Sequence, residues 1–200
     1  AKYSLILIQF FRNNIPTKQV PICECSFYMQ NLKVDWKNEA ISLTLYKDHS
    51  ILAGVYSNLF QTNEPLRKLA EVYAFENDFE ACLLINNEKK IVESTRGAVF
   101  LIFNYKIYTP PLSSGVVNSV SREVLIDFIN KNNSYDIIEV DIPVFNLQRA
   151  DEIFLFSFQH GLTKIIKFRK KVYSSEKSKT IEGLFSDHLG ISFEMGFQEY

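Results

Sequence analysis

The stretch ACLLINNEKKIVESTRGAVFLIFNYKIYTPPLSSGVVNSVSREVLIDFI, residues 81–129, decides the fold. Its first part alternates apolar runs with short polar turns, which is typical of a β-meander. Pro110 and Pro111 end the meander, because proline cannot donate a hydrogen bond to a sheet. Apolar residues then recur at helical spacing from residue 119 to residue 131. The stretch therefore predicts strands at 79–86, 91–94, 97–103 and 107–109, followed by an amphipathic helix whose inward residues are Val120, Val124, Leu125, Phe128 and Ile129.

The remainder of the chain mixes strands and helices in the same way. Apolar segments before the stretch predict an antiparallel sheet, and segments after it predict further strands and two helices. The expected elements are strands at 3–11, 20–30, 40–46, 135–143, 152–158 and 162–168, and helices at 64–77, 144–151 and 180–190. The fold class is thus α+β, with a domain boundary near 48–56 and a solvated loop at 167–179. The core is expected to contain Phe100, Leu101, Ile102, Val124, Leu125, Phe128, Phe154 and Leu155.

Charge and composition exclude several classes of partner. The 22 basic and 23 acidic residues give a net charge of −1, so no strong field attracts nucleic acid or an anionic membrane. The longest apolar runs are strand-sized and too short to cross a membrane. The three cysteines and three histidines are not spaced as zinc ligands, so we expect no metal and a reducing, cytoplasmic setting. These residues are Cys23, Cys25, Cys82, His49, His160 and His188.

Several motifs, taken in order, resemble the core of the class IV aminotransferase family. They are Glu93-Ser94-Thr95, Val99-Phe100, the YTPPL run at 108–112, the segment 114–122 and ADEIFLFSF at 150–158, with QFFRNN at 9–14 resembling the close of the family's smaller domain. This family is fold-type IV of the pyridoxal phosphate enzymes, and it includes branched-chain and D-amino-acid aminotransferases and aminodeoxychorismate lyase. The resemblance implies a D-amino-acid aminotransferase-like fold. It assigns 1–48 to a remnant of the smaller N-terminal domain and 56–200 to the larger C-terminal domain.

The resemblance also assigns cofactor-binding residues. Pyridoxal phosphate acts as an electron sink while its ring nitrogen is protonated, which requires a buried carboxylate beside it. Glu93 stands at that position. The phosphate is held by backbone N–H groups at a helix N-terminus, and Ser119, Val120 and Ser121 stand there. Two plainer alternatives remain open: Glu93 as an exposed turn carboxylate, and Ser119 as an ordinary helix cap.

The cofactor lysine of the family lies in a segment of the form S-N-(L/F)-K-x-x-N-Y-L-P. VYSNLFQTNEPL, residues 55–66, aligns with it without a gap, and Phe60 stands at the lysine position. Phenylalanine cannot form an imine with the cofactor aldehyde, because the imine requires an amine. Neither Lys47 nor Lys68 offers a simple replacement. Further departures are Glu64 at a tyrosine position, Ala98 at an asparagine position, and Phe156 and Phe158 where the family has small or hydroxyl residues near the phosphate.

Two functions follow from this pattern, and whether the chain is an enzyme stays open at this point. We expect a catalytically degenerate homologue, a pseudoenzyme without a catalytic residue at position 60 and without covalently bound pyridoxal phosphate. The alternative is an active aminotransferase or 4-amino-4-deoxychorismate lyase whose lysine comes from elsewhere. The resemblance implies a homodimer. The family's N-terminal segment, with an aromatic-Gly-Asp-Gly motif and a phosphate-assisting arginine, has no counterpart in these residues. Two explanations stay open here: the protein never had this segment, or the segment lies outside the given sequence.

Overall fold

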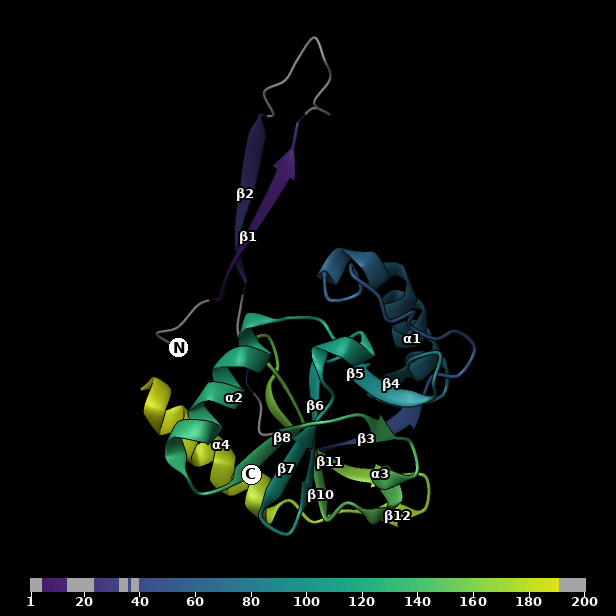
Figure 1. Ribbon diagram of the computed structural model, residues 1–200, viewed down its shortest axis with the longest axis vertical. Coiled ribbons are helices and arrows are strands. Elements are labelled where there is room, and N and C mark those ends of the chain that lie inside the picture. Colours follow the sequence, from purple (N-terminus) through teal and green to yellow (C-terminus); the bar gives the residue numbers. More distant parts are fainter. Residues whose placement is uncertain (1–4, 14–23, 33–35, 37–39, 191–200) are drawn as a thin grey trace, which may run out of the picture. The chain divides into compact units, whose positions relative to one another are not determined.

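The chain forms two compact units, residues 1–35 and residues 36–200. The computed structural model describes residues 5–13, 24–32, 36 and 40–190. In the first unit, β1 (Leu5–Arg12) and β2 (Cys25–Leu32) form an antiparallel pair, seen in Figure 1. Cys23 and the segment 14–20 lie outside the described residues. The assignment of 1–48 to the family's smaller domain stays a prediction.

Among the described residues, the second unit is built on a ten-stranded sheet. The strands run in the order β8 (Asp136–Glu139), β7 (Lys106–Thr109), β6 (Ala98–Phe103), β10 (Glu152–Ser157), β11 (Gly161–Phe168), β3 (Ala40–Leu45), β4 (Ala81–Ile85), β5 (Lys90–Ser94) and β9 (Ile142–Pro143), with β12 (Lys171–Val172) paired to β11. The helical elements are η1 (Phe60–Asn63), α1 (Glu64–Glu76), η2 (Leu112–Ser114), α2 (Val120–Asn132), α3 (Asn146–Arg149) and α4 (Glu176–Leu189). The mixed α+β fold that the sequence predicts is therefore confirmed.

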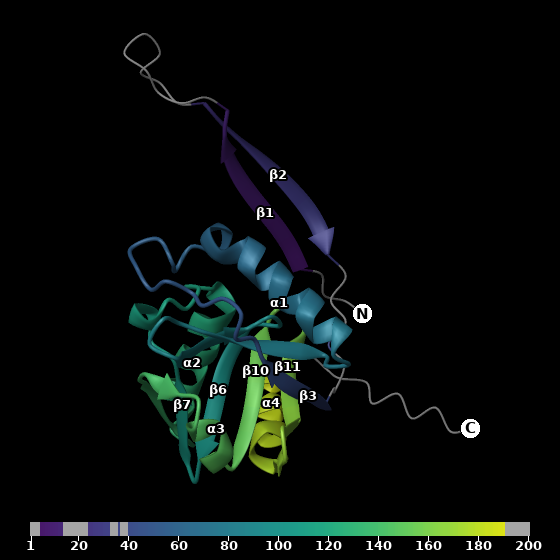
Figure 2. The same cartoon turned by 90° about the vertical axis from the view of Figure 1, so that its right-hand side faces the viewer.

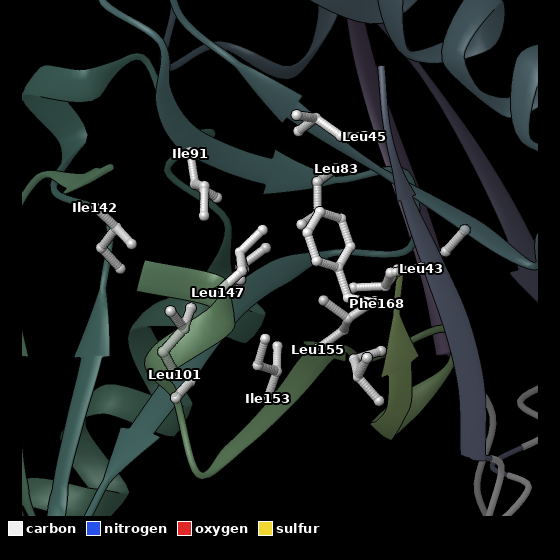
Figure 3. Close-up of a cluster of buried hydrophobic side chains, with 14 of the residues drawn as sticks. Leu43, Leu45, Leu83, Ile91, Leu101, Ile142, Leu147, Ile153, Leu155 and Phe168 are labelled. Carbon is white, nitrogen blue, oxygen red and sulfur yellow. The ribbon is translucent and has the colours of Figure 1, made fainter. Parts of the chain in front are cut away.

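The sheet curls around one apolar cluster. Leu101 of β6 and Ile142 of β9 both belong to it, although their strands lie toward opposite ends of the strand order. Figure 3 shows these side chains pointing toward one another, together with Leu83, Leu155 and Phe168. Because residues from both ends of the sheet meet in one cluster, the sheet is strongly bent, as the right-handed twist of β-strands favours.

Two further clusters fix the helices on the outside of the sheet. Phe128 of α2 and Phe185 of α4 pack edge to face, with ring centroids 5.0 Å apart, over Phe154 and Phe156 of β10. Helix α1 packs elsewhere, with Ala70 and Ala74 against β4. Figures 1 and 2 show α2 and α4 together and α1 apart from them. The helix that follows Phe60 thus covers a separate part of the sheet.

Several predicted details of the strands differ in the structure. The segment 40–46 is not part of an antiparallel sheet with the first two strands: β3 lies in the large sheet, parallel to both β4 and β11. The segment 135–143 forms two strands, β8 and β9, at opposite ends of the sheet. The expected solvated loop at 167–179 contains β12 and the first turn of α4. Each difference depends on pairing with segments that are distant in sequence, and local periodicity carries no information about such pairing.

The predicted core is confirmed, with small exceptions on the helices. Of the eight expected core residues, seven are buried and Val124 is half-buried. Val120, expected to face inward, is exposed at the start of α2. Leu69, placed by its spacing on the inner face of α1, is also exposed. On both α1 and α2, the buried face is therefore narrower than the spacing of apolar residues indicates.

Candidate functional site

The turn that precedes α1 is held against the loop that precedes α2. The side-chain amide of Asn58 donates hydrogen bonds to the carbonyl oxygens of Leu112, at 2.7 Å, and Val116, at 2.6 Å. The carbonyl of Asn58 in turn accepts a bond of 3.0 Å from the N–H of Asn118. These three bonds place residues 57–63 beside the entry to α2, although more than 50 residues separate them in sequence.

Phe60 begins the short η1 helix and is half exposed, with 53% of its surface accessible. Its carbonyl oxygen accepts a hydrogen bond of 2.5 Å from Nη1 of Arg67. Its ring lies over the same guanidinium, with 5.0 Å between Cζ of Arg67 and the ring centroid. At this distance the ring's negative face attracts the cation. Phe60 therefore serves as a support for Arg67 and brings no reactive group to the site.

Glu93, near the end of β5, is buried, so the alternative of an exposed turn carboxylate is wrong. Its Oε1 lies 2.5 Å from Nε of Arg67, in an ion pair with both side chains buried. Its Oε2 accepts a hydrogen bond of 3.3 Å from the N–H of Val117. Burial raises the pKa of the Glu93 carboxyl, while Arg67 and the Val117 N–H oppose that rise. Both carboxylate oxygens thus have protein partners.

Arg67 is the residue that sequence reasoning missed. It precedes Ala70 by three residues and Ala74 by seven, which places a charged side chain on the buried stripe of α1. Such a charge in an apolar stripe is the signal that could have identified it, because a buried arginine is rarely left without an acidic partner. Its Nη2 is buried and has no hydrogen-bond partner in the described part of the chain.

The start of α2 forms the other side of this region. Ser119 is the N-cap residue, and its hydroxyl accepts a 3.3 Å hydrogen bond from the N–H of Arg122, so the serine-cap alternative is confirmed. The hydroxyls of Ser119 and Ser121 lie 3.2 Å apart. The Val117 N–H, two residues before Ser119, bonds Glu93, so the structure brings the predicted carboxylate close to the predicted phosphate-binding turn. The binding of phosphate by the Val120 and Ser121 N–H groups stays a prediction.

The two aromatic residues of the β10 end do not crowd Glu93. The ring of Phe156 is fully buried in the cluster under α2 and α4, and Phe158 packs beside it with centroids 5.7 Å apart. The part of this segment that meets the turn after Glu93 is the Phe156 backbone and Ser157: a Cβ on Gly97 would lie 2.4 Å from the Phe156 carbonyl oxygen and 2.9 Å from the Ser157 Cβ. Phe156 is thus a core residue, and the idea that its ring fills cofactor volume receives no support.

Lys47 and Lys68, the two lysines considered as replacements, and the buried Lys164 lie away from position 60 or are paired with acidic residues. Lys47 is exposed, and Lys68 is exposed on α1 with its Nζ 2.8 Å from Glu71. Lys164 is buried, with its Nζ 2.5 Å from Glu182 of α4, under the helices that lie apart from α1. Within residues 40–190 and the other described segments, no group of three acidic, histidine or cysteine side chains is gathered as a metal site.

Pyridoxal phosphate, the cofactor implied by the resemblance, does not fit this site as a covalently bound group. The resemblance assigns Phe60 to the position of its lysine, and Glu93, the carboxylate that it assigns to the ring nitrogen, is paired with Arg67 at 2.5 Å. A protonated ring nitrogen beside Glu93 would have to displace the guanidinium and leave a buried cation without its partner, which is strongly unfavourable.

A family model and several known proteins match the chain. The family model for amino-transferase class IV matches residues 14–168, which is more than half of the chain. A relative from Methanocaldococcus jannaschii, named as a branched-chain-amino-acid aminotransferase, is 21% identical over 141 residues, or 68% of this chain and 48% of its own. A relative of the same kind from Aquifex aeolicus is 24% identical over 62% of this chain and 38% of its own. The chain thus spans half or less of the length of these relatives.

Solved structures show the same fold. The branched-chain amino acid aminotransferase from Thermobaculum terrenum, in its PLP-bound form, superposes with a TM-score of 0.80 at 18% identity, over 94% of this chain and 65% of its own. A 4-amino-4-deoxychorismate lyase structure from Legionella pneumophila gives a TM-score of 0.73 at 18% identity, over 84% of this chain and 62% of its own. At these identities the likeness supports the architecture alone.

Proposed function

Because the chain belongs to the class IV aminotransferase family, we propose that it is a member that has lost covalent pyridoxal phosphate chemistry and acts through a remodelled site or a partner surface. One observation carries this proposal: Phe60 stands at the lysine position, in a segment whose Asn58 is fixed by three hydrogen bonds. A shift of the alignment by one or two residues would not change this, because residues 55–66 contain no lysine.

The consequences for the chemistry are direct. When bound, the cofactor supplies an electron sink for reactions at an amino acid's α-carbon, and a lysine must hold its aldehyde and carry the α-proton. The Phe60 side chain can do neither. The Arg67 guanidinium beside it is held in its ion pair with Glu93. Transamination and aminodeoxychorismate-type elimination are therefore not supported by the residues of this region.

The proposed setting of the protein follows its family. We propose a cytoplasmic homodimer, in which pyridoxal phosphate is absent or bound without a covalent link. The two cysteines in the described part of the chain, Cys25 and Cys82, are free thiols, which is typical of reducing compartments. No helix in the described ranges is long and apolar enough to cross a membrane.

The test is a titration of the wild-type protein with pyridoxal phosphate, followed by borohydride reduction and peptide mapping. We expect no saturable visible band of a protein imine, and only scattered labelling of exposed lysines such as Lys68. A band that saturates at one equivalent, with label on a single lysine peptide, would show that an amine comes from elsewhere. That result would favour the alternative, an active aminotransferase or 4-amino-4-deoxychorismate lyase.

A further inference from the structure

We infer that Arg67 has replaced the cofactor as the counter-ion of Glu93, so that this protein folds and stays folded without pyridoxal phosphate. The inference rests on the proposed function and adds a specific residue to it. A carboxylate buried as deeply as Glu93 needs a positive charge or a proton, since desolvation strongly disfavours a lone charge. In this chain the positive charge comes from α1, through the ion pair of 2.5 Å between Nε of Arg67 and Oε1 of Glu93.

The position of Arg67 is fixed from two sides. Its Nη1 donates to the Phe60 carbonyl at 2.5 Å, and the Phe60 ring covers the guanidinium at 5.0 Å. The residue that removes the lysine thus also supports the cation that pairs with Glu93. A lysine side chain at position 60 would bring a second positive charge beside the guanidinium, which like-charge repulsion disfavours. Phe60 therefore holds the Arg67 guanidinium in the position from which it pairs with Glu93.

Each carboxylate oxygen of Glu93 already accepts a hydrogen bond from a donor within the protein. Oε1 is held by Arg67 and Oε2 by the Val117 N–H. Among the residues that the structure describes, Nη2 of Arg67 has no hydrogen-bond partner and is buried, so the guanidinium makes its pair with Glu93 at the cost of one unsatisfied donor group. This arrangement keeps the carboxylate closed to a pyridine ring while Arg67 is in place.

The first experiment is a double-mutant cycle on the free energy of unfolding, with Arg67→Met, Glu93→Gln and the double variant. Breaking a buried pair by removing one partner is expected to lower the folding equilibrium constant roughly 10²- to 10³-fold, whereas removing both charges costs far less. The matched control is Lys68→Met, the next residue on α1, whose exposed pair with Glu71 is expected to change that constant about fivefold or less.

The second experiment measures ligand binding with pyridoxamine 5′-phosphate, whose amine cannot form an imine with lysine. We expect this probe to leave the melting temperature of the wild-type protein unchanged. It is expected to raise the melting temperature of an Arg67→Ser variant in a saturable way, because Glu93 then faces an open site. The variant Arg67→Ser combined with Glu93→Gln is expected to lose that response.

Additive effects of the single variants, or a double variant that does not fold, would overturn the counter-ion role of Arg67. Equal stabilisation of the wild-type protein and Arg67→Ser by the probe would also overturn it. Single variants that do not fold beside a double variant that does would support it. None of these outcomes depends on whether a lysine is trapped in the wild-type protein, so a failure here is distinguishable from a failure of the proposed function.

Discussion

The buried Glu93 carboxylate is stabilised by Arg67, and Phe60 contacts the same guanidinium. A buried carboxylate is stable only with a proton, a cation or several donors around it. Here a guanidinium and one backbone N–H meet that requirement for Glu93. The phenylalanine at position 60 supplies a carbonyl and a ring face to the same guanidinium. The local chemistry thus favours a closed ion pair over an open cofactor site.

The pH dependence of stability tests this pair. In an Arg67→Met variant, burial is no longer opposed by the guanidinium, so the pKa of Glu93 rises further above its ordinary value. An acid with a higher pKa in the folded state stabilises the fold below its unfolded pKa of about 4.3, and this contribution is lost as the pH rises toward the folded pKa. We therefore expect the deficit in unfolding free energy, relative to wild type, to grow as the pH is raised. Urea titrations at several pH values measure it, and a constant deficit would be inconsistent with an unpaired buried carboxyl.

Sequence patterns singled out Phe60 and Glu93 because each falls at a fixed place in a motif that resembles the family's, and their roles toward the cofactor stay predictions. They did not identify Arg67, whose partner lies 26 residues further on and on a different element. They also placed Phe156 at the cofactor site, whereas its ring belongs to the core under α2 and α4. Near the end of a strand, the direction of a side chain depends on the curvature of the sheet. The motif alone does not specify this direction.

At the scale of elements, Asn58 connects the turn before α1 to the loop before α2. An Asn58→Ala variant loses two side-chain hydrogen bonds and leaves the Leu112 and Val116 carbonyls without those donors. We expect a loss of about 2–3 kcal/mol in unfolding free energy, from roughly 1–1.5 kcal/mol per bond. The control is Asn63→Ala, since the Asn63 bond to the Ser57 carbonyl is long, at 3.5 Å. Equal losses in the two variants would show that Asn58 is not a specific tether.

The N-terminus of α4 is fixed by a carboxylate from another element. Glu152 of β10 is buried and accepts hydrogen bonds from the Lys177 N–H, at 2.9 Å, and from the Ser178 N–H and hydroxyl, at 2.9 and 2.7 Å. Burial raises the pKa of Glu152, but these bonds outweigh it and hold the pKa below its ordinary value. The sequence predicted α4 to begin at residue 180, because this cap comes from a strand about 25 residues earlier and leaves no local signal.

We expect Glu152→Gln to lower the unfolding free energy by about 1–3 kcal/mol near neutral pH, because a charged acceptor is removed from the helix N-terminus. A group with a depressed pKa contributes stability above its unfolded pKa and loses it as the pH falls through the folded pKa. The difference between wild type and variant is therefore expected to shrink in acid. Glu176→Gln, exposed on the first turn of the same helix, is the control. A pH-independent difference would contradict this assignment.

For the whole molecule, stability depends on the cluster that the curled sheet encloses. Ile165 and Ile166 are neighbours on β11, but Ile165 is fully buried in this cluster whereas Ile166 is 41% exposed. We expect Ile165→Ala to cost about 2–5 kcal/mol through lost contacts and an internal cavity. Ile166→Ala is expected to cost less than about 1 kcal/mol. Chemical denaturation measures both, and equal costs would show that the cluster is not the main support of the sheet.

Predictions from sequence succeeded best for which side chains are buried, because strand and helix periodicity directly report which of them face inward. Most of the predicted core residues lie in the cluster under α2 and α4. They were weakest for topology. The sequence of the strand 40–46 does not indicate that it pairs in parallel with β4 and β11. Likewise, the sequence of 135–143 does not indicate that it forms two strands at opposite ends of the sheet. Pairing of distant strands is decided by the whole chain, so it is visible only in the folded molecule.

The most direct test of the account is borohydride trapping of pyridoxal phosphate in Phe60→Lys and in Phe60→Lys combined with Arg67→Ser, mapped by peptide mass spectrometry beside the wild-type protein. The account predicts label at position 60 in the double variant, because the amine is restored and Glu93 is released from the guanidinium. It predicts little label there in Phe60→Lys alone. Specific label on one lysine of the wild-type protein, or full label at position 60 while Arg67 is still present, would contradict it.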